Sequence, residues 1–233
     1  MPNKFKILTI FFLIFSSFTT QSFSRDGTGA ATEYKVTVYR VWLCEDGSTE
    51  SNCLNKKLVS DGNTKTVDIA ATTAGAAAAT MGSLGKADFG TKYTYVQVEM
   101  DRGMTITGTD GDCVTSGDGS LTAFAAGKAS GNTPASATLY VPGTDTQGAT
   151  MDNNINGYRS SDGRTSAAAT VEDDDDYIWW RGVIANNGVT LKQGQIPTLK
   201  IAFGVSNAVE GNHATCTNAH MNAGKPEVSI SFN

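Results

Sequence analysis

Apolar and polar residues alternate with a period of two over several short stretches of the chain, the pattern typical of β-strands. In residues 33–43 (EYKVTVYRVWL) the alternation slips around Tyr39 and Arg40, which indicates a β-bulge. In residues 92–100 (KYTYVQVEM) it is regular, so that Val96 and Val98 share one face and Gln97 the other. Further strands are expected at 54–59, 64–69, 104–109, 138–141, 177–184, 198–205 and 227–232, with a turn at 101–103.

Eight to ten short strands without a convincing long helix predict an all-β fold, an antiparallel β-sandwich. Residues 70–85 are rich in Ala, Gly and Thr and are interpreted mainly as a crossing loop. The longest stretch without apolar periodicity, 143–167, is expected to be a polar loop. We therefore expect one domain over residues 25–233.

The first third of the chain resembles a known group of domains. Val67-Asp68-Ile69, a Gly- and Ala-rich stretch, and then Gly90 followed by a strand opening with Tyr-Thr (residues 90–98) are similar to the prealbumin-like sandwich modules of bacterial surface proteins. The resemblance implies a β-sandwich at a cell surface, and it carries no active site.

Residues 1–24 have the organisation of an export signal. Lys4 and Lys6 precede the apolar residues 7–15, and Ser22 and Ser24 supply small residues at the −3 and −1 positions of a cleavage site. The apolar stretch is too short to span a bilayer. We expect a mature chain that begins near Arg25, without a transmembrane span, and that is secreted, periplasmic or at the cell surface.

Four cysteines follow this leader: Cys44, Cys53, Cys113 and Cys216. An even number in an exported protein indicates two disulfides, for which three connectivities are possible. Cys44 and Cys53 flank a polar loop between two apolar runs, so a bridge there would staple a hairpin. The favoured pairing is therefore Cys44–Cys53 and Cys113–Cys216.

The charge balance excludes some partners. The whole chain has a net charge of −5, and removing the two lysines of the leader leaves 16 basic against 23 acidic residues, or −7. An acidic chain without a basic cluster argues against binding to nucleic acid or to anionic lipid.

One pattern suggests a calcium ion. Asp152, Asn154 and Asn156, followed by Gly157, fit the opening of a calcium-binding loop, in which alternate side-chain oxygens converge on one cation. The twelfth position of such a loop needs a bidentate Glu, and here it is Gly163. A polar turn is the plain alternative.

A run of four carboxylates is the second calcium candidate. Asp173, Asp174, Asp175 and Asp176 repel one another unless they are solvated or paired with a cation, and Glu172 precedes them. The plain alternative is a solvated acidic loop before the next strand. We expect no cofactor, with Ca²⁺ as the alternative.

A third pattern involves sulfur and imidazole. Cys216, His220 and Met221 are similar to the ligand loop of the blue copper proteins, with His213 as the other histidine. The usual first histidine of those proteins lies far upstream, and a disulfide to Cys113 would remove the thiolate.

Aromatic residues suggest a carbohydrate ligand. On a strand over 177–184, Tyr177 and Trp179 share one face and Ile178 and Trp180 the other. If the second face is core, Tyr177 and Trp179 form a platform on which sugar rings stack. Alternatively both are large hydrophobic residues under a covering loop.

The sequence contains no motif of a serine hydrolase, a zinc protease or a nucleotide-binding loop, although a fold-dependent carboxylate pair leaves an enzyme as an alternative. We expect a non-enzymatic protein of the cell surface or the medium, acting in adhesion, an extracellular matrix or a surface assembly. Its partners would be itself or other surface proteins through edge strands, at 33–43 or 227–232. The alternatives are a calcium-dependent carbohydrate-binding module that takes glycans and a small outer-membrane β-barrel.

Overall fold

The computed structural model describes residues 27–71, 83–120, 125–128, 131–141, 157–159, 165–166, 177–194, 199–212, 216, 220–224 and 226–232. The predicted leader, residues 1–24, lies outside these ranges. In the described part of the chain no helix has the length and apolarity needed to cross a membrane.

The fold is all-β with antiparallel strand pairing, as the alternation predicts, and the 3₁₀ turn η1 (Leu84–Lys86) lies between β4 and β5. The strands are β1 (Gly27–Gly29), β2 (Ala31–Glu45), β3 (Lys57–Leu58), β4 (Lys65–Asp68), β5 (Lys92–Asp101), β6 (Gly103–Asp110), β7 (Cys113–Thr115), β8 (Ala125–Lys128), β9 (Ala137–Tyr140), β10 (Gly157–Arg159), β11 (Thr165–Ser166), β12 (Tyr177–Val183), β13 (Val189–Thr190), β14 (Leu199–Gly204), β15 (Val209–Asn212), β16 (His220–Ala223) and β17 (Glu227–Phe232). Fifteen of them form one sheet, and β14 and β17 form a separate pair.

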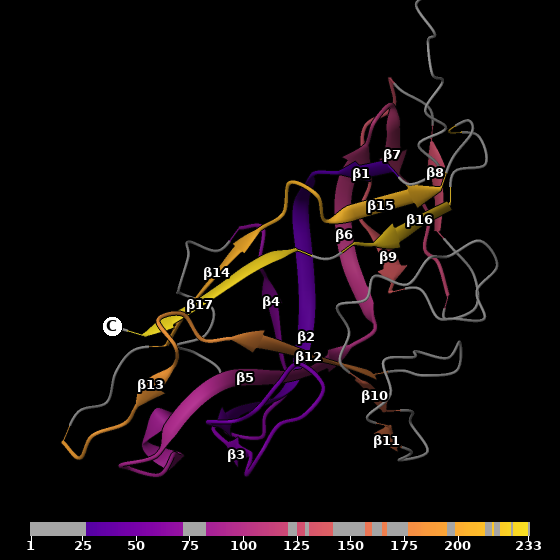
Figure 1. Cartoon of the computed structure of the whole chain (residues 1–233). Coiled ribbons are helices and arrows are strands. Elements are labelled where there is room, and N and C mark those ends of the chain that lie inside the picture. Colours follow the sequence, from indigo (N-terminus) through magenta and orange to yellow (C-terminus); the bar gives the residue numbers. More distant parts are fainter. Residues whose placement is uncertain are drawn as a thin grey trace, which may run out of the picture.

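The long strand β2 connects the two ends of the molecule, as Figure 1 shows. Along one edge it pairs with β6 at residues 31–35 and with β5 at residues 38–45. Its register shifts between Val38 and Arg40, which confirms the predicted bulge. Along its other edge it pairs with β4 and β3. The proposal that this strand is a free edge was therefore wrong.

The junction of β5 and β6 also differs from the prediction. Both strands run antiparallel to β2, so the chain bends at Arg102 and continues in the same direction without the expected turn. Arg102 is fully buried, and its Nε donates to the carbonyl oxygen of Val141 (2.6 Å). The amide of Val141 donates to the carbonyl of Arg102 (3.1 Å), so the bend is fixed by the chain that leaves β9. The buried side chain of Arg102 thus holds a bend at the position where the sequence predicts a turn over residues 101–103.

One end of the molecule closes on itself. The sheet order β1-β15-β16-β8-β7-β6-β2 brings β1 next to β15, while Thr109 of β6 donates its amide to the carbonyl of Ala30 (2.9 Å). At this closure a Cβ on Gly29 would lie 1.7 Å from the carbonyl oxygen of Thr109, so only glycine permits the approach. The segment that begins at Gly27 therefore pairs within its own chain.

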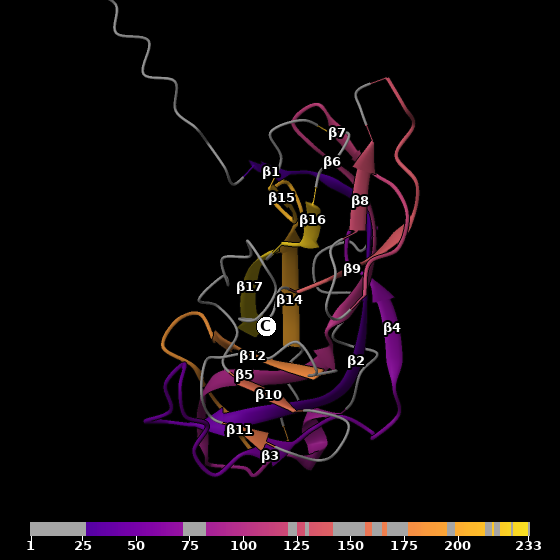
Figure 2. The same cartoon turned by 90° about the vertical axis from the view of Figure 1, so that its right-hand side faces the viewer.

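The pair β14–β17 lies to one side of β2 and supplies a second layer (Figure 2). Its side chains share one hydrophobic core with those of the main sheet. The core side chains from the two layers include Val96, Val98 and Ile178 of the main sheet and Leu199, Ile201 and Ile230 of the pair. This two-layer packing confirms the predicted antiparallel β-sandwich.

Both predicted disulfides are present. Cys44–Cys53 closes a separation of 9 residues and Cys113–Cys216 one of 103. Disulfides persist in oxidising compartments, so they suggest an environment outside the cytoplasm. Because Cys216 is bonded to Cys113, no thiolate is left for copper, and that candidate is removed.

Candidate functional site

The outer face of the main sheet carries the richest side-chain chemistry among the described residues. In register, Trp42 of β2 lies opposite Gln97 of β5, which lies opposite Arg181 of β12, and Trp179 lies opposite Glu99. Residues opposite each other point to the same face, so these five side chains project from the side of the sheet that is turned away from the core. We call this side of the sheet the outer face. Four of its five side chains are themselves buried: Trp42, Gln97, Glu99 and Arg181 are 7%, 1%, 2% and 7% exposed.

The inner side of the same strands is apolar, as the alternation requires. Ile178 is 3% exposed, and Trp180 packs against the hydrophobic core. The prediction that Tyr177 and Trp179 share the face opposite to Ile178 and Trp180 is therefore confirmed. Tyr177 and Trp179 are both half-buried.

Two cationic side chains lie over the aromatic rings of this face. The Nζ of Lys56 is 5.3 Å from the ring centroid of Trp42 and 5.7 Å from that of Trp179. The Cζ of Arg181 lies 5.9 Å from the ring centroid of Trp179. Attraction between a cation and the ring quadrupole contributes about 0.5–2 kcal/mol per contact, depending on solvation. The outer face therefore combines aromatic surface with positive charge.

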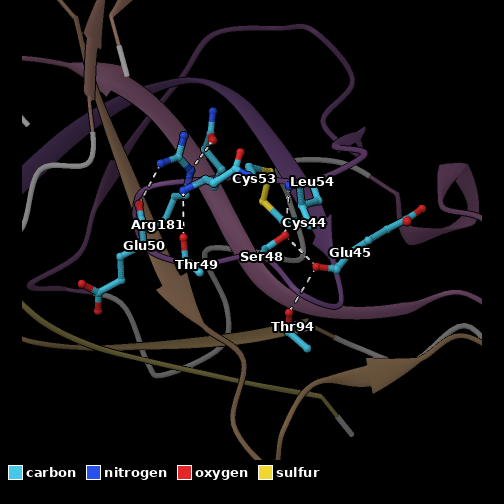
Figure 3. Close-up of a disulfide and its surroundings, with 11 residues drawn as sticks. Cys44, Glu45, Ser48, Thr49, Glu50, Cys53, Leu54, Thr94 and Arg181 are labelled. Carbon is cyan, nitrogen blue, oxygen red and sulfur yellow. Dashed lines mark hydrogen bonds between the residues drawn. A yellow bond between two sulfur atoms is a disulfide. The ribbon is translucent and has the colours of Figure 1, made fainter. Parts of the chain in front are cut away.

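A disulfide-bound loop covers one end of the outer face (Figure 3). Within the loop, the hydroxyl of Ser48 donates to the carbonyl oxygen of Glu45 (2.6 Å) and accepts from the amide of Leu54 (3.0 Å). Arg181 reaches into the loop and donates from Nη1 to the carbonyl oxygen of Glu50 (2.7 Å). The loop is thus held by one covalent bond and by a charge-assisted hydrogen bond from β12.

Buried donors lie under this loop. The Nε of Arg181 donates to Oε1 of Gln97 (2.6 Å), which leaves the amide nitrogen of Gln97 as a donor. Burial lowers the pKa of Arg181, which nevertheless stays charged at neutral pH. In the described part of the chain, the Nε2 atom of Gln97 and the Nε1 atom of Trp179 are buried and have no hydrogen-bond acceptor. Unsatisfied buried donors are costly, so they mark a place where an acceptor is missing.

At the other end of the outer face, Tyr39 and Tyr177 meet edge to face with their ring centroids 4.8 Å apart. The hydroxyl of Tyr39 lies 3.4 Å from Oδ2 of Asp101. Burial, and next the negative charge of Asp101, raise the pKa of Tyr39, so it remains a neutral phenol at physiological pH.

A second candidate site is the outer edge of β14. The carbonyl of Ile230 accepts from the amide of Ala185 (2.8 Å), so the backbone groups of Ile230 point away from β14. In an antiparallel pair, residues whose backbone groups point away from the partner strand alternate with residues whose backbone groups point towards it, and two residues in register share the same orientation. The register Ile201↔Ile230 then directs the backbone groups of Leu199, Ile201 and Phe203 to the outer edge of β14.

Among the described residues, no strand pairs with this edge. Beyond the end of β14, the carbonyl of Val205 accepts from the amide of Ala31 (3.0 Å), which continues the same alternation. The last strand, β17, was the other predicted edge, and Ile184 and Ala185 already contact its second side at Ile230. The more open edge thus belongs to β14.

The predicted calcium ligands Asp152, Asn154, Asn156, Asp173, Asp174, Asp175 and Asp176 lie outside the described residues, so calcium stays a prediction. Within the described ranges no three His, Cys, Asp or Glu side chains are grouped to hold a metal ion. His213 also lies outside these ranges.

Sequence reasoning found Tyr177 and Trp179 but missed Trp42, Lys56 and Arg181. Their grouping depends on the register of β2 and β12 against β5 and on the path of the loop, which the pattern of one strand does not specify. Comparison with known proteins adds no homologue: no protein-family model, no curated protein and no solved structure matches the chain.

Proposed function

We propose that this chain is an exported, non-enzymatic protein that acts in a surface assembly or an extracellular matrix and associates through the outer edge of β14. The observation that supports this function most directly is the second layer of the sandwich, in which the described residues form the pair β14–β17 and no further strand. A strand from a neighbouring molecule would extend that layer.

The chemistry of the edge suits backbone pairing. Leu199 and Ile201 direct their side chains into the core, where they are 8% and 7% exposed. An added strand would therefore be recognised mainly by the backbone N–H and C=O groups at the edge. Strands of many different sequences can form these backbone hydrogen bonds. The partner is a second copy of this chain or another surface protein with an exposed strand.

Two disulfides support the location. Together with the predicted leader they favour a protein outside the cytoplasm, where a cross-linked sandwich resists unfolding. Expression of the full chain in its own cells, followed by fractionation and electron microscopy, tests the location and the assembled state together.

Association is tested with two variants that change the charge equally. Ala202→Lys places an ammonium beside the outer edge of β14, and Ser229→Lys places one on the neighbouring strand β17, directly opposite Ala202 but farther from the edge. Because a lysine at an edge opposes strand addition, Ala202→Lys should weaken association in sedimentation equilibrium by about tenfold. Ser229→Lys should change it less than threefold. Equal effects of the two variants on association would contradict this function. So would a wild-type protein that stays monomeric at every concentration in solution and also at the cell surface.

A further inference from the structure

We propose that Tyr39 and Tyr177 are an oxidative cross-linking site, at which a one-electron oxidant of the peroxidase class joins the two phenol rings as dityrosine. The cross-link ties β2 to β12 across β5. It uses no residue of β14 and is independent of the proposed assembly.

The first argument is the β-bulge in β2. The register of β2 on β5 shifts between Val38 and Arg40, so Tyr39 is the extra residue of the bulge. A bulge redirects the side chain that it carries, and bulges are common beside functional sites. Here Tyr39 reaches over Asp101 of β5 and meets Tyr177, which lies opposite Asp101 on the other flanking strand, β12. The bulge thus brings together two tyrosines whose strands lie about 10 Å apart.

The second argument is the contact between the two rings. Their centroids are 4.8 Å apart, with an interplanar angle of 89°. Burial raises the pKa of Tyr39 most, followed by the charge of Asp101 and by Tyr177, which also hydrogen-bonds to Tyr39. Because the hydroxyl ends meet, the Cε carbons beside them, through which tyrosyl radicals couple, lie close together.

Both rings have room to reach the geometry of the product. Tyr39 and Tyr177 are half-buried, and neither belongs to the hydrophobic core. Side chains outside a packed core rotate about their own torsions. The rings can therefore turn from the perpendicular contact towards the arrangement in which a carbon–carbon bond forms.

The third argument is a base placed at the phenol. A phenol that loses an electron must also lose its proton, and the Tyr39 hydroxyl donates to Oδ2 of Asp101 at 3.4 Å. The other carboxylate oxygen, Oδ1, accepts from the amide of Gly103 (3.2 Å), which orients the group. Asp101 is therefore placed to accept the proton as the electron leaves.

The reaction balances with hydrogen peroxide as the final oxidant. Each tyrosine gives up one electron and its hydroxyl proton, and together these reduce one hydrogen peroxide to two water molecules. The two tyrosyl radicals form a bond between their Cε carbons. The hydrogen on each of these carbons then moves to the neighbouring oxygen and restores the phenol. The product has two hydrogen atoms fewer than the starting protein.

Other tyrosines of the described chain are placed differently. Tyr34 and Tyr93 lie in the core, where they are 1% and 0% exposed. Tyr95 is half-buried and lies on the same face of β5 as Asp101, but opposite Val183. Tyr95 is therefore a matched control for a tyrosine of this face.

The test treats the disulfide-bonded full chain with a haem peroxidase and one equivalent of hydrogen peroxide. The monomer is isolated by size exclusion, and its peptides are analysed by mass spectrometry and by dityrosine fluorescence. In the wild type we expect a linked pair of peptides that contains Tyr39 and Tyr177 and has lost two hydrogen atoms. Its yield should not depend on protein concentration, because the link forms within one chain. The cross-linked monomer should also unfold at a higher urea concentration than the untreated protein.

Three variants with unchanged melting temperatures complete the test. Tyr39→Phe should abolish the linked product, and Tyr95→Phe should leave its yield unchanged. Asp101→Asn should lower the initial rate of its formation about tenfold, because the base is lost. A dityrosine that persists in Tyr39→Phe, an equal loss in Tyr95→Phe, or a monomer without the link would overturn the proposal. An unchanged rate in Asp101→Asn would contradict the role of its carboxylate.

Discussion

The two ends of β2 have different structural surroundings. At its first residues, β1, β6 and β15 close around the strand, and the carbonyl of Ala30 and the backbone of Gly29 meet β6 directly. At the end near Glu45, the main sheet instead faces the two-stranded layer β14–β17, and its outer face carries aromatic rings and cations. Where β1 meets β6, the backbone groups of Ala30 and Thr109 are used within the chain, whereas among the described residues no strand pairs with the outer edge of β14. This contrast assigns stability to the first end and recognition to the second.

The disulfides should give the largest difference between the two ends. In the chain-entropy description, the bridge Cys113–Cys216 stabilises by about 4–5 kcal/mol and Cys44–Cys53 by about 2–3 kcal/mol, because the first closes the longer loop. Denaturant unfolding of the two double Cys→Ser variants measures both values. If removing Cys44–Cys53 cost more stability than removing Cys113–Cys216, the assignment of stability to the first end of β2 would be contradicted.

A single hydroxyl tests the closed end next. The Tyr34 hydroxyl donates to the carbonyl oxygen of Gly224 (2.7 Å), and its ring is 1% exposed. Burial raises the pKa of Tyr34 far above its usual value, so the proton remains available for this bond. Tyr34→Phe should cost about 1–2 kcal/mol, because a buried carbonyl loses its donor.

The matched control for this change is Tyr39→Phe. Its hydroxyl reaches Asp101 only at 3.4 Å and is part-buried, so the loss should be below about 0.5 kcal/mol. Thermal unfolding of Tyr34→Phe and Tyr39→Phe measures both losses of stability. Equal losses would show that the hydroxyl at the closed end contributes no more to stability than the one at the other end.

The smallest predicted effect depends on pH. The pKa of Glu33 is lowered to about 2 by its hydrogen bond from Lys35 and then by those from Thr107 and Ser136. The hydroxyl of Thr107 donates to Oε2 of Glu33 (2.7 Å). A carboxyl whose folded pKa is lowered stabilises the fold above its unfolded pKa, and this contribution is lost as the pH falls towards the folded pKa.

Glu33→Gln should therefore be less stable than the wild type by about 0.5–1 kcal/mol at pH 7, which is the scale of a partly exposed ion pair. The difference should shrink between about pH 4.5 and pH 2. Urea unfolding at several pH values measures it, and a difference that grows on acidification would have the wrong sign.

The sequence predicts the parts of this fold that local periodicity determines. The alternation located β2, β5, β12, β14 and β17, and the phase slip at Tyr39 located the bulge. The shortest strands, such as β7 and β13, were not predicted, because two or three residues are too few to show an alternation. The bend at Arg102 resembles a turn in sequence, and only the shared pairing with β2 shows that the strand continues.

The site was predictable only in part for the same reason. The face shared by Tyr177 and Trp179 follows from the period of one strand, but their neighbours Trp42 and Lys56 come from β2 and from the loop after it. Which edges stay open depends on the order of strands in the sheet, and this order placed β2 inside it and left β14 at an edge.

Amide hydrogen exchange along β14 tests the central claim most directly. In the dilute protein, the amides of Lys200, Ala202 and Gly204 face β17 and should be protected, while those of Leu199, Ile201 and Phe203 face outward and should exchange faster. On assembly the outward amides should become protected and the others should change little. If the six amides are equally protected in the dilute protein, or if the outward set stays unprotected in the assembled form, association through the edge of β14 is contradicted.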